Sequence, residues 1–155
     1  MKTILITGAA SGLGWALSQQ AFALGHRVIM TDMNALQLGA RADALAKEDP
    51  SRVSFHRLDV TDSEAITRLV ALLKEKEGGL DVLINNAGIT HRSLADKTDI
   101  AVFRKVMAVD WQAPVEMAVA CLPLLKRSGG GIINIGSMAG WMPVLGRAGY
   151  CSAKG

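Results

Sequence analysis

The chain has 155 residues and a formal net charge of +3, with 50% apolar and 20% charged residues. This length and composition predict one folded domain and exclude a disordered protein. The basic residues are scattered, the aromatic residues are few and no apolar stretch reaches the roughly 20 residues of a membrane helix, so we expect no nucleic-acid and no membrane partner.

Short apolar segments alternate along the chain with segments whose apolar residues recur at helical spacing. This alternation predicts a fold of the α/β class, a doubly wound parallel sheet of the Rossmann type with ligands outside the carboxyl ends of its strands. The expected strands are residues 2–6, 27–31, 52–58, 80–84 and 132–135. The expected helices are residues 12–24, 34–47, a segment from a cap at Thr61 or Asp62 to Gly78, about 99–126 with a break or new start at Pro114, and a last helix from near Tyr150.

A glycine-rich turn, TGAASGLG at residues 7–14, joins the first expected strand to the first expected helix. Glycines let a backbone approach a pyrophosphate closely, and a helix N-terminus offers unpaired N–H groups and a positive dipole end. The spacing is one variant of the dinucleotide-binding pattern, although an ordinary tight loop is the alternative for such a turn. The residues of this turn assigned to the cofactor are Gly8, Ser11, Gly12, Leu13 and Gly14.

Asp32 ends the second expected strand, where an acid can accept hydrogen bonds from the ribose of an adenosine. The alternative is a helix cap or turn residue before Asn34. A carboxylate at this position repels a 2′-phosphate, so we expect NAD as the cofactor more than NADP. Arg27 and Arg41 are basic, but they lie outside the positions where the ribose is expected.

Asp59 and Val60 follow the third expected strand and are assigned to the cofactor as neighbours of the adenine. Asp59 can equally cap the turn at Thr61. The sequence alone leaves both roles of Asp59 open, because either places the carboxylate at the carboxyl end of a strand.

Tyr150 and Lys154 are four residues apart, so a helix places them on one face about one turn apart. A free tyrosine has a pKa of about 10 and is a poor base at neutral pH. A nearby ammonium favours the phenolate and lowers that pKa, so that Tyr150 can take a proton from an alcohol or return it to a ketone. Without other motifs, a plain surface pair is the commoner explanation of this spacing.

Five motifs occur in order along the chain and together resemble the short-chain dehydrogenase/reductase family. They are TGAASGLG, LDVTD at residues 58–62, NNAG at 85–88, INIGSMAG at 133–140 and YCSAK at 150–154. The resemblance spans the whole chain. It implies an NAD(P)-binding Rossmann domain that transfers a hydride between a nicotinamide and a hydroxyl or carbonyl carbon of a small alcohol or carbonyl substrate.

The resemblance also implies roles for individual residues. Ser137, Tyr150 and Lys154 look like the catalytic residues, with Ser137 hydrogen-bonded to the reacting oxygen, and the last two also contact the cofactor. The backbone of Asn86, Ala87 and Gly88 looks like part of the cofactor pocket.

One position departs from the family pattern. The family usually has an asparagine in the helix before the fifth strand, where it supports a proton relay through water to the lysine, and Asp110 aligns with it. An ionised aspartate cannot donate a hydrogen bond, and it brings a negative charge near Lys154. Asp110 is therefore a candidate catalytic residue that supports or mistunes Tyr150, and a cap of the second half of the helical region is the alternative.

Members of this family continue well beyond the lysine of the last motif, so residues 1–155 are expected to be a single NAD(P)-binding domain, incomplete at the C-terminus, with C-terminal strands and helices missing. A fragment of a longer gene product is favoured over a truncated natural chain. Two functions stay open: an oxidoreductase, and a catalytically inactive nucleotide-binding fragment or self-associating remnant. A homo-oligomer is expected.

No metal site is expected, because His26, His56 and His91 have no ligand spacing and Cys121 and Cys151 fit free thiols in a reducing compartment. The N-terminus has no signal-peptide pattern, so we expect a cytoplasmic protein. An apolar loop around Trp141 hints at an apolar substrate, and it can equally pack against a further segment.

Overall fold

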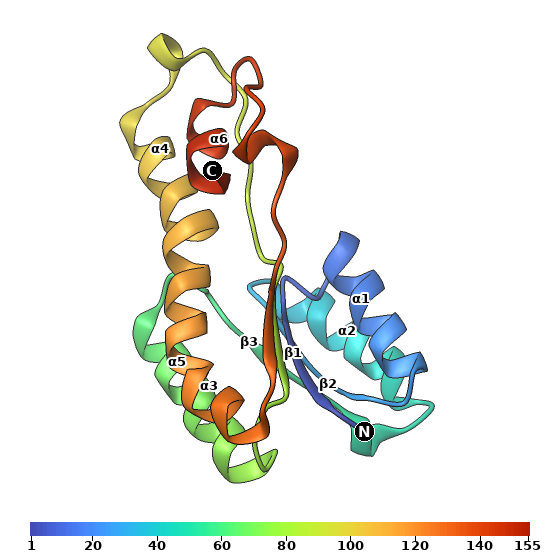
Figure 1. Cartoon of the computed structure of the whole chain (residues 1–155). Coiled ribbons are helices and arrows are strands. Elements are labelled where there is room, and N and C mark those ends of the chain that lie inside the picture. The colour runs from blue at the N-terminus through green and yellow to red at the C-terminus, as the bar shows by residue number, and fades with distance from the viewer.

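Five parallel strands form one sheet in the order β3-β2-β1-β4-β5 in the computed structural model, which describes residues 1–155 (Figure 1). This order confirms the expected doubly wound Rossmann-type sheet. The chain reverses its direction of winding between β1 and β4, and such a switch point leaves a crevice at the carboxyl ends of the strands. The strands are β1 (Thr3–Thr7), β2 (Arg27–Asp32), β3 (Val53–Arg57), β4 (Val82–Asn85) and β5 (Gly131–Asn134).

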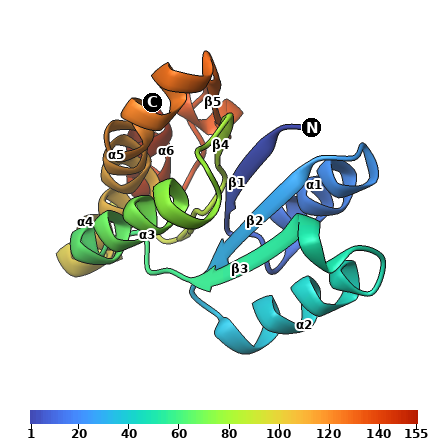
Figure 2. The same ribbon diagram turned by 90° about the horizontal axis from the view of Figure 1, so that it is seen from below.

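Helices cover both faces of the sheet, as Figure 2 shows from below. One face packs on α1 (Gly12–Ala23) and α2 (Ala35–Ala46), and the other packs on α3 (Ser63–Lys76) and α5 (Ala113–Ser128). Because successive side chains of a strand point to opposite faces, Ile4 and Ile6 of β1 join the first core cluster and Leu5 joins the second. The central strands β1, β2 and β4 are thus buried on both faces, which explains their nearly continuous apolar sequences.

Two further helices lie beyond the carboxyl ends of the strands. They are α4 (Ile100–Met107) and α6 (Ala148–Lys154), which contact each other and stand above the sheet in Figure 1. Short 3-10 turns occur at Pro50–Arg52, Ala95–Lys97 and Met138–Gly140. No helix is both long enough and apolar enough to cross a membrane.

The strands and the first three helices agree with the sequence-based boundaries to within two residues at each end. Asp62, one of the two expected caps, begins α3 by accepting a hydrogen bond from the Ala65 N–H at 3.0 Å. Asn34 begins α2 in the same way, by accepting from the Gln37 N–H at 3.1 Å.

The long helical region differs from the expectation in one respect. A π-turn at Ala108–Gln112 separates α4 from α5. Pro114 lies in the first turn of α5, where its missing N–H removes no helical hydrogen bond, so the second half does start there. The last helix begins at Ala148, two residues before Tyr150.

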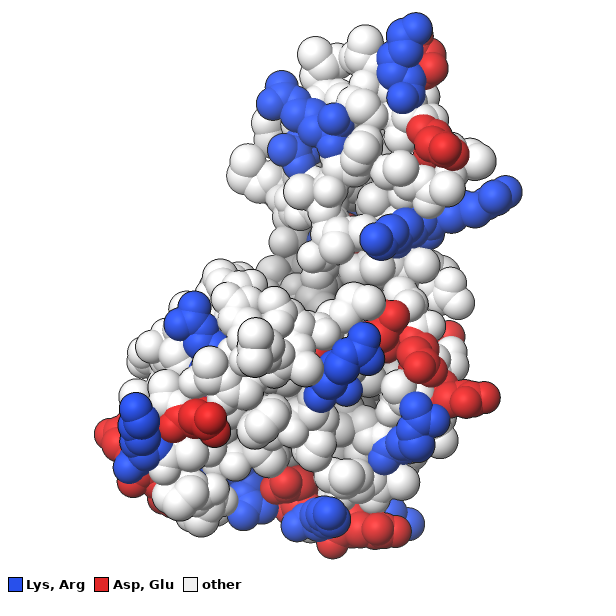
Figure 3. Space-filling model, turned by 180° about the vertical axis from the view of Figure 1, so that it is seen from behind, with Lys and Arg blue, Asp and Glu red and all other residues white.

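Charged side chains of both signs are interspersed over the face of the molecule in Figure 3. No large patch of a single sign dominates that face. The scattered basic residues of the sequence are therefore also scattered in space on this side.

Candidate active site

The glycines of the turn after β1 serve two different purposes. Gly14 packs against the turn itself, because a Cβ added there would lie 2.0 Å from the Gly8 carbonyl oxygen, and a Cβ on Gly8 would lie 2.9 Å from the Ala87 Cα. Gly12 instead has a left-handed φ of +53° and open space where a Cβ would stand. The turn is therefore tightly packed on its inner side and open on its outer side, as a phosphate cradle requires.

Asp32 holds this turn in place. Its Oδ2 accepts a hydrogen bond from the Ala10 N–H at 3.0 Å, and its Oδ1 accepts from the Asn34 N–H at 2.9 Å. The second bond is the local turn proposed as the alternative role of Asp32. The half-buried carboxylate also lines the main cavity described below, so the structural role and a place beside a ribose coexist.

Arg41 also contacts the turn, which its position in the sequence did not indicate. Its Nε donates to the Ala10 carbonyl oxygen at 3.2 Å, and its guanidinium carbon lies 5.0 Å from the centre of the Trp15 ring. Arg41 lies outside the positions where the ribose was expected, and the packing of α2 beside β2 brings it near the turn. The cation reaches the turn through the packing of α2, and no local sequence pattern reveals that packing.

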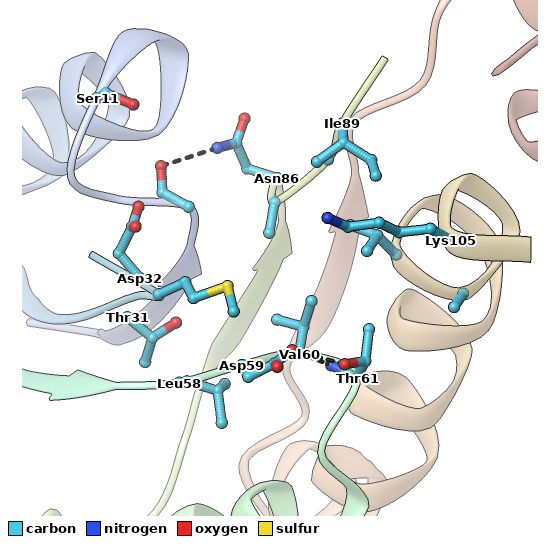
Figure 4. A pocket seen from close by; sticks show the side chains of 16 residues that line it. Ser11, Thr31, Asp32, Leu58, Asp59, Val60, Thr61, Asn86, Ile89 and Lys105 are labelled. Atoms are coloured by element: carbon cyan, nitrogen blue, oxygen red, sulfur yellow. Dashed lines mark hydrogen bonds between the residues drawn. The ribbon is translucent and has the colours of Figure 1, made fainter. Parts of the chain in front are cut away.

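A cavity of about 610 Å³ opens at the carboxyl ends of the strands (Figure 4). Its volume is in the range of small-molecule and cofactor sites. Of the residues assigned to the cofactor, those that line it are Gly8, Ser11, Asp32, Asp59, Val60, Asn86, Ala87 and Gly88. Gly12, Leu13 and Gly14 do not line it, and neither do Tyr150 and Lys154.

Asp59 forms the turn that was its alternative role. Its Oδ1 accepts from the Thr61 N–H at 2.9 Å and from the Thr61 hydroxyl at 2.7 Å. These two hydrogen bonds lower the pKa of Asp59, so the carboxylate is ionised at neutral pH. It therefore presents a fixed negative charge at the edge of the cavity.

Lys105 is a cavity residue that sequence reasoning missed. Its side chain points from α4 into the cavity in Figure 4, and its charge makes a small contribution to the lowered pKa of Asp59. Lys105 stands three and four residues before Ala108 and Val109, which line the same cavity. This spacing places the three residues on one face of the helix, but the sequence does not show that this face is turned toward the cavity.

The ends of β1 and β4 are tied together by Thr7 and Asn86. The Thr7 hydroxyl accepts from the backbone N–H groups of Asn86 at 3.0 Å and Ala87 at 2.9 Å. The Asn86 amide donates back to the carbonyl oxygens of Thr7 at 3.1 Å and Gly8 at 3.2 Å. The NNAG segment is thus fixed against the glycine-rich turn, and Thr7 joins Arg41 and Lys105 as a residue whose role no sequence pattern indicated.

Tyr150 and Lys154 lie on α6 as their spacing predicted. The Lys154 Nζ is 6.0 Å from the centre of the Tyr150 ring and donates to the Ile135 carbonyl oxygen at 3.0 Å. Ser137 begins the 3-10 turn that packs on α6, and its Oγ accepts from the Ala139 N–H at 3.2 Å. The three side chains thus come from two neighbouring segments.

Tyr150 and Lys154 line cavities other than the main one. Lys154 lines a second cavity of about 400 Å³ that shares Ala87 with the first, and Asp110 lines it too. Tyr150 lines a narrow crevice together with His91. The two cavities therefore meet at the NNAG segment, between the glycine-rich turn and the tyrosine-bearing helix.

Asp110 is buried in the π-turn, with 4% of its surface exposed. Its Oδ1 accepts from the Ile89 N–H at 2.8 Å, and its Oδ2 is buried without a hydrogen-bond partner. Burial raises the pKa of Asp110, while the Ile89 N–H and the charge of Lys154 oppose that rise. No side chain caps α5, so the alternative role of Asp110 as a helix cap is wrong.

The strand order, the glycine-rich turn and the acid at the end of β2 define a Rossmann-type nucleotide-binding fold. The model of the short chain dehydrogenase family matches residues 2–155. The chain belongs to this family.

Three relatives illustrate the similarity. The uncharacterized oxidoreductase YxbG of Bacillus subtilis is 36% identical over 99% of this chain and 56% of its own length. Trans-4-hydroxycyclohexanecarboxylate dehydrogenase of Sinomonas cyclohexanicum is 36% identical over 99% of this chain and 61% of its own. An alcohol dehydrogenase from the archaeon Thermococcus sibiricus, solved with 5-hydroxy-NADP, superposes with a TM-score of 0.95 at 27% identity, over 99% of this chain and 66% of that one. The chain thus spans a little over half to two thirds of the length of these relatives.

Proposed function

We propose that the chain is the cofactor-binding part of an NAD-dependent oxidoreductase that transfers a hydride between nicotinamide and a hydroxyl or carbonyl carbon of a small substrate. The observation that carries the proposal is the cavity of about 610 Å³ between the glycine-rich turn, Asp32 and the NNAG segment. A dinucleotide fits these residues: the turn is open at Gly12, and the acid lies where an adenosine ribose is expected.

The nicotinamide supplies or accepts the hydride when it is bound. Tyr150 takes the proton of an alcohol or returns it to a ketone, and the ammonium of Lys154, 6.0 Å from the centre of the Tyr150 ring, places a positive charge beside it. Ser137 holds the same oxygen by a hydrogen bond and so fixes its position. In this proposal Asp110 adds a buried carboxyl near Lys154, and both side chains approach Gly88.

We propose NAD as the preferred cofactor because the Asp32 carboxylate repels a 2′-phosphate. The Asp32→Ala variant should bind NAD more weakly and discriminate less against NADP, which parallel titrations of the two nucleotides measure. If the unchanged protein binds NADP as tightly as NAD, the role given to Asp32 is wrong.

The substrate in this proposal is a small alcohol or carbonyl compound, by analogy with the relative that acts on trans-4-hydroxycyclohexanecarboxylate. An apolar substrate is favoured by the loop at residues 141–145, where Trp141 and Leu145 are 80% and 78% exposed. We also propose that the protein acts in the cytoplasm, as a homo-oligomer.

A second candidate function is a nucleotide-binding unit without turnover, or one that associates with itself. It is favoured by two observations: Tyr150 lies outside the main cavity on a helix of seven residues, and apolar side chains of α5 and β5 are exposed. An isolated helix of this length has little stability of its own.

Turnover distinguishes the two candidates. The 155-residue chain is mixed with NAD and a panel of secondary alcohols, and NADH is followed by its absorbance. We expect NADH formation that the Tyr150→Phe variant lacks. If the chain forms no more NADH than this control, it is not an active oxidoreductase, and NAD binding without turnover then supports the second candidate.

A further inference from the structure

We propose that His91 is a specificity-determining residue whose Nδ1 accepts a hydrogen bond from a second hydroxyl group of the substrate. The preferred substrates are then diols, and in the reverse direction hydroxyketones, over simple alcohols and ketones. This inference rests on the proposed function, because it takes Tyr150 as the group that contacts the reacting oxygen. The remainder of the substrate can be apolar, as the exposed loop at residues 141–145 favours.

His91 is held beside the helix α6. The hydroxyl of Thr90 accepts a hydrogen bond from the Arg147 Nη1, and the Ser93 N–H donates to the Gly146 carbonyl oxygen at 2.8 Å. Figure 1 shows the segment after β4 running beside the segment that leads into α6. His91 lies between these two hydrogen bonds in the sequence, so its backbone is fixed relative to α6.

The hydrogen bonds around His91 determine which of its ring nitrogens carries the proton. The Thr98 hydroxyl donates to the Leu94 carbonyl oxygen at 2.7 Å, so its one proton is used. The Ser93 hydroxyl therefore donates to the Thr98 hydroxyl, with which it is paired. The Ser93 oxygen is then the acceptor for the His91 Nε2 at 2.8 Å, and in the neutral ring a protonated Nε2 leaves Nδ1 as an acceptor.

His91 and Tyr150 line the same narrow crevice, which has about the size of one hydroxyl group. Its volume of about 10 Å³ is close to the least that one water molecule needs. The hydroxyls of Ser93 and Thr98 also line it, and they are engaged with each other. Two polar side-chain atoms of the lining residues make no hydrogen bond within the chain: the His91 Nδ1 and the Tyr150 hydroxyl oxygen.

A substrate with two hydroxyl groups can satisfy both of these atoms. Its reacting oxygen contacts the Tyr150 hydroxyl, and its second hydroxyl donates to the His91 Nδ1. A simple alcohol that covers the crevice leaves Nδ1 without a partner and cut off from water, and an unpaired acceptor of this kind is costly. The small volume also favours a hydroxyl over a bulkier donor.

Arg92 is a weaker candidate for a second contact to the substrate. It follows His91 in the sequence, but it does not line the crevice. Its exposed side chain makes no hydrogen bond and no ion pair that would hold it in one position. Because arginine only donates hydrogen bonds, it would favour an acceptor on the substrate instead of a second hydroxyl donor.

Turnover of matched substrates by the 155-residue chain tests the inference. Cyclohexane-1,2-diol, 2-methoxycyclohexanol and cyclohexanol are compared with NAD, since the methoxy oxygen can accept a hydrogen bond but cannot donate one. We expect kcat/KM to be about fivefold higher for the diol than for either other substrate, which is the effect of one hydrogen bond. His91→Leu should abolish this preference, whereas His91→Asn, which keeps an acceptor near Nδ1, and the control Arg92→Gln should retain it.

An equal loss of kcat/KM for all three substrates in His91→Leu would mean that His91 only supports the local structure, and it would overturn the inference. A preference that survives in His91→Leu would overturn it as well. If the unchanged chain oxidises none of the three substrates, the proposed function itself fails and the role of His91 in it fails too, which is a different result from an equal loss.

A second measurement needs no turnover. The nitrogen chemical shifts of the isotope-labelled imidazole distinguish a protonated ring nitrogen from an unprotonated one. In the neutral ring of His91 we expect the proton on Nε2. Thr98→Val frees the Ser93 hydroxyl to donate to Nε2, so the proportion of ring with its proton on Nδ1 should rise. An unchanged chain with the proton on Nδ1 would contradict the inference.

Discussion

Asp110 stands where the family usually has an asparagine, and it places a carboxyl group at that position. The carboxyl is buried beside Gly88 and Lys154, and its Oδ2 has no hydrogen-bond partner. A charge in such a place opposes folding unless a proton or a counter-ion neutralises it. The nearby ammonium of Lys154 supplies part of that compensation without forming an ion pair.

The raised pKa of Asp110 predicts a pH dependence of stability. The folded chain holds this proton more tightly than the unfolded chain, so the free energy of unfolding should fall as the pH rises from about 4, the ordinary pKa of an aspartate, through the folded pKa. Asp110→Asn removes the penalty and should raise the free energy of unfolding near neutral pH by about 1 kcal/mol, a gain that shrinks toward pH 4. Urea unfolding at several pH values measures both effects.

Asp62→Asn is the matched control. Asp62 is exposed and also accepts a hydrogen bond from a backbone N–H. Because asparagine caps helices about as well as aspartate, the free energy of unfolding of the Asp62→Asn variant should barely differ from that of the unchanged chain. A loss of stability in Asp110→Asn at neutral pH would show that the carboxylate is a net stabilising group.

The glycine-rich turn is the element on which the site is built. Its residues are fixed by Asp32, Arg41 and the Asn86 amide, which reach it from three other parts of the chain. Gly12 and Gly14 are two residues apart, yet different physical constraints require a glycine at each. Gly14 lacks room for a side chain, whereas Gly12 has room and a left-handed backbone.

Alanine substitutions separate these two constraints. Gly14→Ala should destabilise the chain by about 3 kcal/mol or more, because its Cβ would meet a backbone oxygen at 2.0 Å. Gly12→Ala should cost only about 1 kcal/mol, the strain of a left-handed alanine. Urea unfolding measures both, and Gly136→Ala, which has neither constraint, is the control. Equal costs for Gly12 and Gly14 would contradict the packing described for the turn.

The hydrophobic periodicity of the sequence predicts helices and strands better than it predicts which side chains contact one another. The central strands followed from their apolar runs, because a strand covered on both faces favours apolar residues at successive positions. The π-turn at Ala108–Gln112 could not be predicted in this way, because one inserted residue shifts the helical face without interrupting the apolar pattern. Arg41 and Lys105 were missed for a related reason: helix docking decides which face meets the cavity, and neither residue belongs to a local motif.

At the scale of the whole molecule, α5 and β5 together present exposed apolar side chains. Val115, Val119 and Leu122 form a stripe along α5, beside Trp111, and Ile133 is half exposed on β5, which pairs with a single neighbouring strand. A contiguous patch of this kind and an open sheet edge favour association.

We therefore expect the 155-residue chain to self-associate through this face. Val119→Lys should shift the chain toward the monomer in sedimentation velocity, since it places a charge in the middle of the stripe. Leu36→Lys adds the same charge to an exposed apolar position on α2 and should have no such effect. A parent chain that sediments as a monomer at every concentration would refute the association.

The central claim is that the cavity beside the glycine-rich turn binds NAD, and amide chemical-shift mapping of the isotope-labelled chain tests it most directly. On titration with NAD, the shifts should concentrate in the turn at residues 8–14, at Asp32 and in the segments 59–61 and 86–89 that line the cavity. The amides of α3, which lies on the opposite face of the sheet from α1 and α2, should stay unchanged. An absence of shifts at saturating NAD, or shifts confined to residues outside the cavity, would contradict the account.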